Sequence, residues 1–186
     1  MRIVAGKLRG KNLVAPDGKT TRPTSDRARE SVFNVLDSKL RGGGVSWDSL
    51  TVADVFAGTG ALGAEALSRG ASELFAWERD AAAVKCFKQN LAAFEKIGAK
   101  VTLYPDALTL VPARSPVGLL FMDPPYERGL VAPALAALRA GGWIDGNTRC
   151  VVEIANGEKD VLPPEFEIVD ARVYGKARVL FARLNG

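Results

Sequence analysis

Apolar residues in this chain form short runs that alternate with stretches showing helical spacing. Short runs rich in β-branched and aromatic residues predict strands, and the longer amphipathic stretches predict helices. Repeated strand–helix units closed by an antiparallel pair predict an α/β fold, a doubly wound sheet with helices on both faces. The predicted strands are residues 50–56, 73–78, 101–104, 117–122, 150–154, 166–173 and 177–184, and the predicted helices are residues 61–69, 81–94 and 131–140.

The first 44 residues follow a different pattern. Two short β-like pieces, Ile3-Val4-Ala5 and Asn12-Leu13-Val14, flank a turn at Gly10 and predict a basic hairpin. Thr24 or Ser25 is a suitable N-cap for a helix whose apolar positions 28, 32, 35 and 36 recur at helical spacing. A glycine triplet at 42–44 ends this helix. We therefore expect a hairpin-helix appendage over residues 1–44 and a core over residues 45–186.

Composition limits the kinds of site and the compartment. The chain has 186 residues, 47% of them hydrophobic, which suits one substantial core rather than two domains. It has no histidine, which excludes an imidazole base and argues against a catalytic metal, and Cys86 and Cys150 lack the spacing of a zinc site. Since no signal segment or membrane-length apolar run is visible, we expect a soluble cytoplasmic protein without a metal.

The stretch Asp123-Pro124-Pro125-Tyr126 follows an apolar strand and should lie at the carboxyl end of that strand, where open α/β sheets bind ligands. A carboxylate and a proline carbonyl can both accept hydrogens from an exocyclic amino group of a nucleobase. The nitrogen lone pair would then point at an electrophile, while the base stacks on Tyr126 for roughly 1 to 3 kcal/mol. The alternative is an ordinary Asp-Pro-Pro turn in which Tyr126 only packs.

A Gly-x-Gly-x-x-Gly spacing at Gly58, Gly60 and Gly63 lies between a predicted strand and a predicted helix. Glu78 follows at the end of the next strand, where a carboxylate can bind ribose hydroxyls. Asp106, after the third strand, could receive an adenine amino group or could simply cap a helix. The pattern fits a dinucleotide or S-adenosylmethionine, and an Asp-Pro-Pro-Tyr site has an obvious use in methyl transfer but not in hydride transfer.

Positive charge is concentrated at the amino end. The net charge is +4, yet residues 1–41 alone hold ten Lys/Arg against four Asp/Glu. Such a basic region is typical of a nucleic-acid binder, although a solvated basic face without a partner has the same composition. Arginine in a first helical turn opposes the helix dipole, which favours a role in phosphate binding. The expected RNA contacts are Arg9, Lys11, Arg22, Arg27 and Arg29.

Four motifs, spread over nearly the whole chain, resemble those of the bacterial 16S ribosomal RNA guanine-N2 methyltransferase family. The block from Arg-Pro-Thr to Arg-Glu, in front of a methyltransferase core, is the specific part of the resemblance. The motifs are Arg2-x-x-x-Gly6-x-x-Arg9-Gly10, Arg22-Pro23-Thr24-x-Asp26-Arg27-x-Arg29-Glu30, Asp54-x-Phe56-Ala57-Gly58-x-Gly60-Ala61-Leu62-Gly63-x-Glu65-Ala66-Leu67-Ser68-Arg69-Gly70 and Asp123-Pro124-Pro125-Tyr126-x-x-Gly129.

The resemblance implies a seven-stranded Rossmann-like methyltransferase that uses S-adenosylmethionine and modifies one guanine of 16S rRNA in an assembled or partly assembled small ribosomal subunit. We expect a monomer. Some relatives have Phe in place of Tyr126, which suggests that the hydroxyl is dispensable. The expected catalytic residues are Asp123, Pro124, Pro125 and Tyr126, and the expected cofactor-binding residues are Asp54, Phe56, Ala57, Gly58, Gly60, Glu78, Arg79, Asp106 and Ala107.

Two other functions are consistent with parts of the same pattern. A DNA adenine-N6 methyltransferase uses the same type of amino-group site. A non-catalytic RNA-binding factor would keep the basic region but would need neither the glycine turn nor Asp123. Cytosine-C5 chemistry is less favoured, because neither Cys86 nor Cys150 lies in a Pro-Cys loop.

Overall fold

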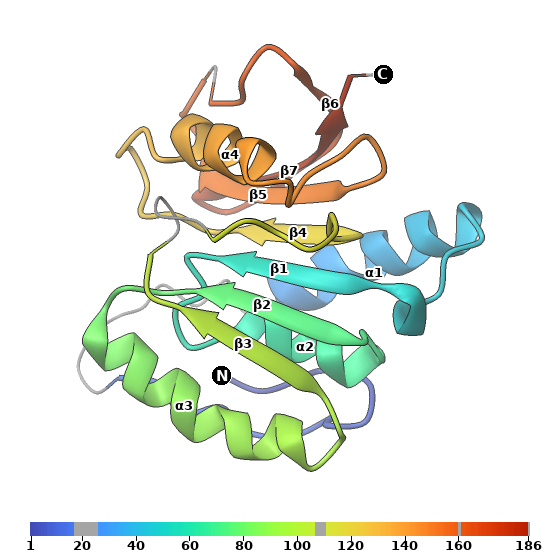
Figure 1. Ribbon diagram of the computed structural model, residues 1–186, viewed down its shortest axis with the longest axis vertical. Coiled ribbons are helices and arrows are strands. Elements are labelled where there is room, and N and C mark those ends of the chain that lie inside the picture. The colour runs from blue at the N-terminus through green and yellow to red at the C-terminus, as the bar shows by residue number, and fades with distance from the viewer. Residues whose placement is uncertain (17–25, 107–110, 160, 186) are drawn as a thin grey trace.

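The computed structural model describes residues 1–16, 26–106, 111–159 and 161–185. Within these residues seven strands form one sheet in the order β3-β2-β1-β4-β5-β7-β6, which confirms the predicted α/β fold (Figure 1). The strands are β1 (Thr51–Val55), β2 (Glu73–Trp77), β3 (Lys100–Tyr104), β4 (Leu119–Met122), β5 (Arg149–Ala155), β6 (Phe166–Tyr174) and β7 (Ala177–Leu184). The helices are α1 (Asp26–Gly42), α2 (Ala61–Arg69), α3 (Ala81–Glu95), α4 (Val131–Ala140) and the 3-10 helix η1 (Trp47–Ser49).

The direction of the strands brings the candidate site together. Strands β1 to β5 are parallel, while β7 pairs antiparallel with β5, and β6 pairs antiparallel with β7. The strand order reverses at β1: β2 and β3 lie on one side of it, and β4 and β5 lie on the other. Val55, at the end of β1, is level with Trp77 on β2 and Met122 on β4. The loops that follow these three strands therefore begin at the same edge, at the switch point where doubly wound sheets bind ligands.

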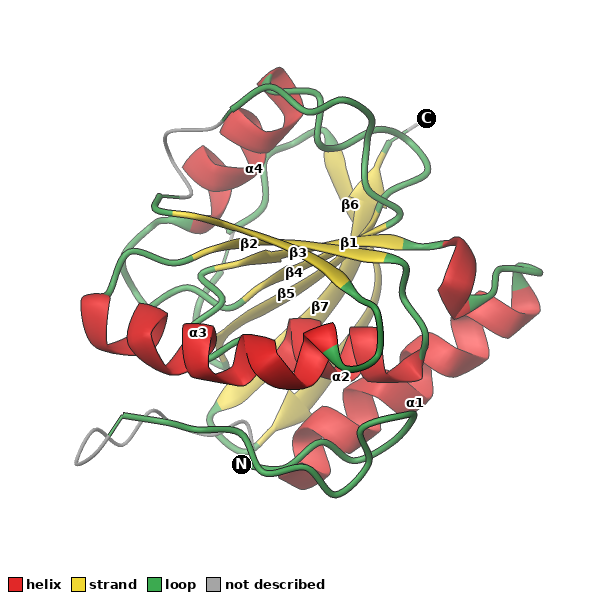
Figure 2. Cartoon of the chain, turned by 60° about the horizontal axis from the view of Figure 1, so that its bottom comes forward, coloured by secondary structure: helices red, strands yellow, loops and turns green. Residues whose placement is uncertain are grey.

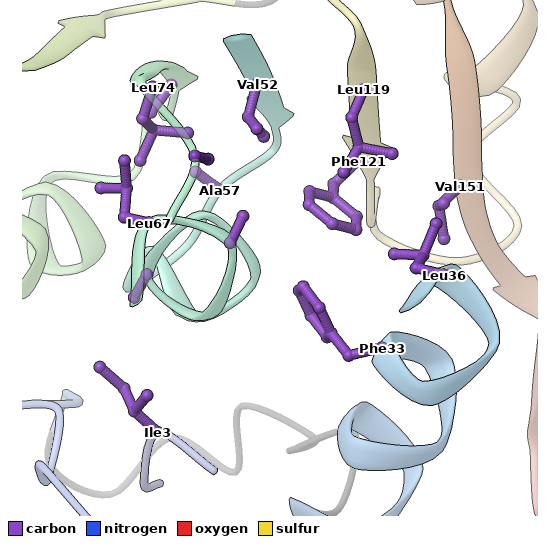
Figure 3. Packing of buried hydrophobic residues seen from close by; sticks show 14 of the residues in the cluster. Ile3, Phe33, Leu36, Val52, Ala57, Leu67, Leu74, Leu119, Phe121 and Val151 are labelled. Atoms are coloured by element: carbon purple, nitrogen blue, oxygen red, sulfur yellow. The ribbon is translucent and has the colours of Figure 1, made fainter. Parts of the chain in front are cut away.

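Helices cover both faces of the sheet, as Figure 2 shows: α1, α2 and α3 lie on one face and α4 on the other. Each face has its own buried hydrophobic cluster. On the first face, Phe33 of α1 points toward Phe121 of β4, and the two ring centroids are 5.4 Å apart (Figure 3). Ile3 belongs to the same cluster. The division at residue 44 stays a prediction, but residues from both sides of it pack together.

The amino-terminal hairpin differs from its prediction. Arg2 and Asn12 form a single antiparallel bridge, and among the described residues no paired strands extend from it. The reason is that the N–H groups of Val4 and Ala5 donate to the carboxylate of Glu65 on α2, at 2.8 and 3.0 Å, instead of to a neighbouring strand. We call residues 1–16 the N-terminal arm. The predicted N-caps of α1, Thr24 and Ser25, lie outside the described residues.

Candidate active site

The turn between β1 and α2 is shaped by backbone conformations that favour glycine. Gly58 and Gly60 have φ angles of +57° and +82°, and Phe56 adopts +63°, which is uncommon for a residue with a side chain. Asp54, only 1% exposed near the end of β1, accepts a hydrogen bond from the Gly63 N–H at 2.9 Å. This bond ties the end of the strand to the first turn of α2 and holds the glycine turn between them.

Two glycines of this turn face different surroundings. A Cβ added to Gly60 would lie 2.5 Å from Cε2 of Phe87, so Gly60 is required by packing. A Cβ added to Gly58 would meet no described protein atom within 4 Å. Gly58 therefore borders open space at the carboxyl edge of the sheet, and the absence of a side chain there lets a ligand approach the backbone closely. Ala57 is buried, and its N–H donates to the Trp77 carbonyl at 2.9 Å.

Glu78 connects the glycine turn to the end of β2. Its carboxylate accepts the N–H of Gly58 at 2.7 Å through one oxygen, and the N–H groups of Arg79 and Asp80 at 2.8 and 2.7 Å through the other. The same carboxylate therefore holds the turn after β1 and the start of the loop before α3. Asp106 is half-buried shortly after β3, the strand beside β2. Ala107, the other residue expected there, lies outside the described residues.

Burial changes the electrostatics of the carboxyl group of Asp54. Burial raises its pKa from 3.8 to about 7. The N–H of Gly63 opposes this rise by stabilising the charged form, whereas the negative charge of Glu78 adds to it. The role that the structure supports for Asp54 is to hold the glycine turn, since its carboxylate bonds to the backbone of that turn.

Asp123 begins the loop that follows β4, directly beside the end of β1. Its N–H donates to the carbonyl of Val55 at 3.3 Å, so the predicted catalytic loop and the glycine turn start from adjacent strands. Burial raises the pKa of the Asp123 carboxyl group well above its usual range, and the negative charges of Glu153 and Asp54 raise it further. A carboxylate with a raised pKa binds a proton more strongly than an exposed aspartate does.

The residues after Asp123 differ in exposure. Pro124 is buried, Pro125 is exposed and Tyr126 is half-buried. The hydroxyl of Tyr126 donates to Oε1 of Glu153 on β5 at 2.5 Å. Sequence reasoning missed Glu153, because its neighbours in residues 150–154 are apolar and the whole run fits a buried strand. One carboxylate within such a run was the available signal, since a buried charge needs a partner.

The N-terminal arm lies against α2 and α3, on the side of these helices away from the sheet (Figure 2). Ser68 of α2 accepts the N–H of Lys7 with its carbonyl at 2.7 Å and that of Leu8 with its hydroxyl at 2.8 Å. Asn90 of α3 is 3% exposed and bridges the arm to the glycine turn. Its side chain accepts the N–H of Val14 at 2.8 Å and donates to the carbonyl groups of Val14 at 3.2 Å and Thr59 at 3.0 Å.

The predicted RNA-contacting residues fall into three groups. Arg9 and Lys11 on the arm and Arg27 at the start of α1 are exposed, as phosphate contacts require. Arg22 lies outside the described residues. Arg29 is a correction, because it is 2% exposed and its guanidinium donates to the carbonyl of Arg2. It fastens the arm to α1 and is not presented to a nucleic acid.

The described ranges hold neither a metal site nor a membrane span. In them, no group of three His, Cys, Asp or Glu side chains could hold a metal ion. No helix among the same residues is long and apolar enough to cross a membrane.

Comparisons with known proteins agree with this geometry. The model of a family described as Conserved hypothetical protein 95 matches residues 1–183. Ribosomal RNA small subunit methyltransferase D of Escherichia coli K12 is 35% identical over 178 residues, which cover 95% of this chain and 86% of the relative.

Two solved structures are similar to this chain over nearly its whole length. The E. coli protein yhhF, described as a candidate methyltransferase, has a TM-score of 0.80 and 32% identity, with 99% of this chain and 97% of that chain covered. A hypothetical protein of Thermus thermophilus has a TM-score of 0.77 and 28% identity over 99% of both chains. The chain therefore belongs to the Conserved hypothetical protein 95 family, a family of methyltransferases that includes ribosomal RNA small subunit methyltransferase D.

Proposed function

We propose that this protein transfers a methyl group from S-adenosylmethionine to the exocyclic N2 amino group of a guanine in 16S rRNA. The observation that carries the proposal is the meeting of two loops at one edge of the sheet. The Asp123 loop and the glycine turn start from β4 and β1, and the Asp123 N–H bonds to the last residue of β1 at 3.3 Å. The similarity to ribosomal RNA small subunit methyltransferase D supports rRNA as the substrate class.

The methyl donor would occupy the space beside Gly58. S-adenosylmethionine supplies an electrophilic methyl group on a sulfonium, and the missing side chain at Gly58 allows its nucleoside to approach the backbone. Glu78 already accepts three backbone N–H groups, which leaves about one of its four lone-pair sites for a ribose hydroxyl. Asp106 would accept the adenine amino group. The other expected contacts in this region are Phe56, Ala57, Gly60 and Arg79, with Ala107.

The guanine amino group would be held on the other side of the same edge. Asp123 and the Pro124 carbonyl accept its two hydrogens, which directs the nitrogen lone pair toward the methyl group. The target base must leave its stack to reach this loop, and the ring of Tyr126 gives it a surface to stack on. Because the pKa of Asp123 is raised, this carboxylate is also suited to take the proton that the amino group loses. Most of the catalytic effect would come from positioning, which can supply several kcal/mol.

The basic surface of the arm and α1 would bind RNA phosphates. Arg9, Lys11 and Arg27 are exposed on segments that pack next to one another around Arg29 and the Arg2 carbonyl. We propose the small ribosomal subunit, assembled or partly assembled, as the partner and the cytoplasm as the compartment, with the protein acting as a monomer. A triple variant R9A/K11A/R27A should weaken binding to 16S rRNA and reduce the slope of log K against log salt by about 0.7 to 0.9 for each phosphate that is no longer neutralised. An unchanged slope would rule these three residues out as phosphate contacts.

The decisive assay measures transfer of a radiolabelled methyl group from S-adenosylmethionine to small ribosomal subunits, naked 16S rRNA and duplex DNA. We expect label in rRNA, and digestion followed by mass spectrometry should identify it as N2-methylguanine. Asp123→Ala should abolish transfer, while calorimetry shows nearly unchanged binding of S-adenosylmethionine. Label in adenine of the DNA arm would support the DNA methyltransferase instead. A protein that binds RNA but not S-adenosylmethionine would support the non-catalytic binding factor.

A further inference from the structure

Glu153 is a buried carboxylate that reaches the Asp123 loop from the neighbouring strand. Strand β5 pairs parallel with β4, with Val152 level with Met122, so Glu153 lies one residue past the last pair, next to Asp123. It is 8% exposed and accepts the Tyr126 hydroxyl at 2.5 Å. A hydrogen bond to a charged acceptor is shorter and stronger than one between neutral groups.

The position of Glu153 has an electrostatic cost that core packing alone does not explain. Residues 150–152 and 154 of β5 are buried apolar residues, and an apolar side chain at 153 would continue that pattern without burying a charge. Burial raises the pKa of Asp123 most, and the negative charges of Glu153 on β5 and Asp54 on β1 raise it further. A buried carboxylate kept next to the carboxyl group of Asp123 suggests that its bond to Tyr126 serves the site.

A second carboxylate fixes the same loop one residue later. Glu127 has a φ angle of +58°, a conformation that residues with side chains rarely adopt. Its N–H donates to one oxygen of Glu158 at 3.1 Å, and the other oxygen of Glu158 accepts the N–H of Ala155 at 2.8 Å. Tyr126 is therefore tied to the end of β5 through its hydroxyl and, at the next peptide, through the backbone.

We propose that Glu153 is a positioning residue for methyl transfer, which holds the Tyr126 ring at the angle that brings the stacked base to Asp123. This inference rests on the proposed function and deepens it. It also assigns a role to the Tyr126 hydroxyl, which the resemblance alone suggests is dispensable. The ring of a Phe at this position can still stack, but it has no hydroxyl through which Glu153 can fix its orientation.

The test uses the nearly isosteric variants Tyr126→Phe and Glu153→Gln and their combination, assayed for kcat and KM with small ribosomal subunits. We expect Tyr126→Phe to lower kcat by about tenfold, which is the scale of one hydrogen bond to a charged group. Glu153→Gln should lower kcat less than Tyr126→Phe does, because the amide oxygen of the new side chain can still accept the Tyr126 hydroxyl. The combined variant should be no slower than Tyr126→Phe, because once the Tyr126 hydroxyl is gone the change at Glu153 has no bond left to weaken. The affinity for S-adenosylmethionine should change less than about twofold.

Two controls separate this inference from simpler explanations. Tyr174→Phe removes another tyrosine hydroxyl, which bonds to Ser31 on α1 at 2.9 Å, and should leave kcat unchanged. The pH profile of kcat should move to lower pH in Glu153→Gln, because burial still raises the pKa of Asp123 but one of the two negative charges that raise it further is gone. Instability alone would not move the profile.

The outcomes that overturn the inference are specific. Full kcat in Tyr126→Phe overturns it, even if Glu153→Gln fails to fold, and so do losses that multiply in the combined variant. A native protein that does not methylate subunits overturns the proposed function and this inference together.

Discussion

Replacing Asp54 by Asn tests how the buried carboxyl group beside the glycine turn affects stability. The substitution removes the ionisable group but keeps an oxygen that can accept the Gly63 N–H, now 2.9 Å from Oδ2. In the unfolded chain Asp54 ionises near pH 3.8, whereas in the folded protein burial raises its pKa to about 7. Its contribution to folding is therefore complete below pH 3.8 and is lost as the pH rises from 3.8 to about 7.

The size of this effect follows from the two pKa values. Each pH unit between 3.8 and about 7 lowers the free energy of unfolding by about 1.4 kcal/mol. Relative to low pH, the native protein is therefore less stable by about 1.5 kcal/mol at pH 5 and by about 4 kcal/mol at pH 8. Asp54→Asn carries no charge at either pH. Its free energy of unfolding, relative to the native protein, should therefore rise by about 2.5 kcal/mol between pH 5 and pH 8. The charge of Asp54 also raises the pKa of Asp123, so its removal acts in the same direction.

Urea unfolding followed by circular dichroism at pH 5 and pH 8 measures this difference. Asp48→Asn, the same chemical change at an exposed position on η1, serves as the control and should alter the free energy of unfolding by less than about 0.5 kcal/mol at both pH values. If the difference between Asp54→Asn and the native protein stays constant or shrinks from pH 5 to pH 8, the electrostatic account of Asp54 is wrong.

Three further predictions concern the glycine turn and the arm. Gly58→Ala should lower the free energy of unfolding by only about 1 kcal/mol, which is the cost of placing a side chain at a φ of +57°. The added methyl group should nevertheless weaken binding of S-adenosylmethionine at least about tenfold, as measured by calorimetry, because it enters the open space beside the turn. Native affinity would contradict the proposed donor site. Gly60→Ala should cost about 3 kcal/mol or more in urea unfolding, because its Cβ would lie 2.5 Å from Phe87, and a loss no larger than that of Gly58→Ala would refute the packing argument. Glu65→Ala leaves the N–H groups of Val4 and Ala5 without their acceptor, so these two amides should exchange with deuterium at least about tenfold faster. The amides of β1 should be unchanged. If Val4 and Ala5 exchange as slowly as in the native protein, the arm is held by other contacts.

Much of the fold could be predicted because its elements have clear periodicity. Helices α2 and α4 begin and end at the predicted residues, and the seven strands overlap the predicted runs. The meeting of Asp123 with the glycine turn followed from a general property of parallel sheets, in which the carboxyl ends of neighbouring strands share an edge. Such features depend on local pattern and on topology, both of which the sequence displays.

The contacts that complete the site depend on residues far apart in the chain. Glu65 binds the N–H of Val4 from 61 positions away, and Asn90 binds that of Val14 from 76 positions away, and no local pattern indicates either pair. The burial of Arg29 could have been found, since it precedes Val32 and Phe33 by three and four residues and so lies on the buried side of α1. The charge of an arginine favours an exposed position, but the helical spacing of Arg29 from Val32 and Phe33 places it on the buried side of α1.

The way in which the N-terminal arm is attached affects how this surface can change. Glu65, Ser68 and Asn90 all bind backbone groups of the arm, at Val4, Ala5, Lys7, Leu8 and Val14. None of these bonds requires a particular side chain on the arm itself. Substitutions at exposed positions such as Arg9 and Lys11 can therefore accumulate without detaching the segment. On the proposed role of the arm in RNA binding, a lineage could change which nucleic-acid surface it recognises while the candidate active site keeps its shape. A protein engineer could introduce new recognition residues at the same positions.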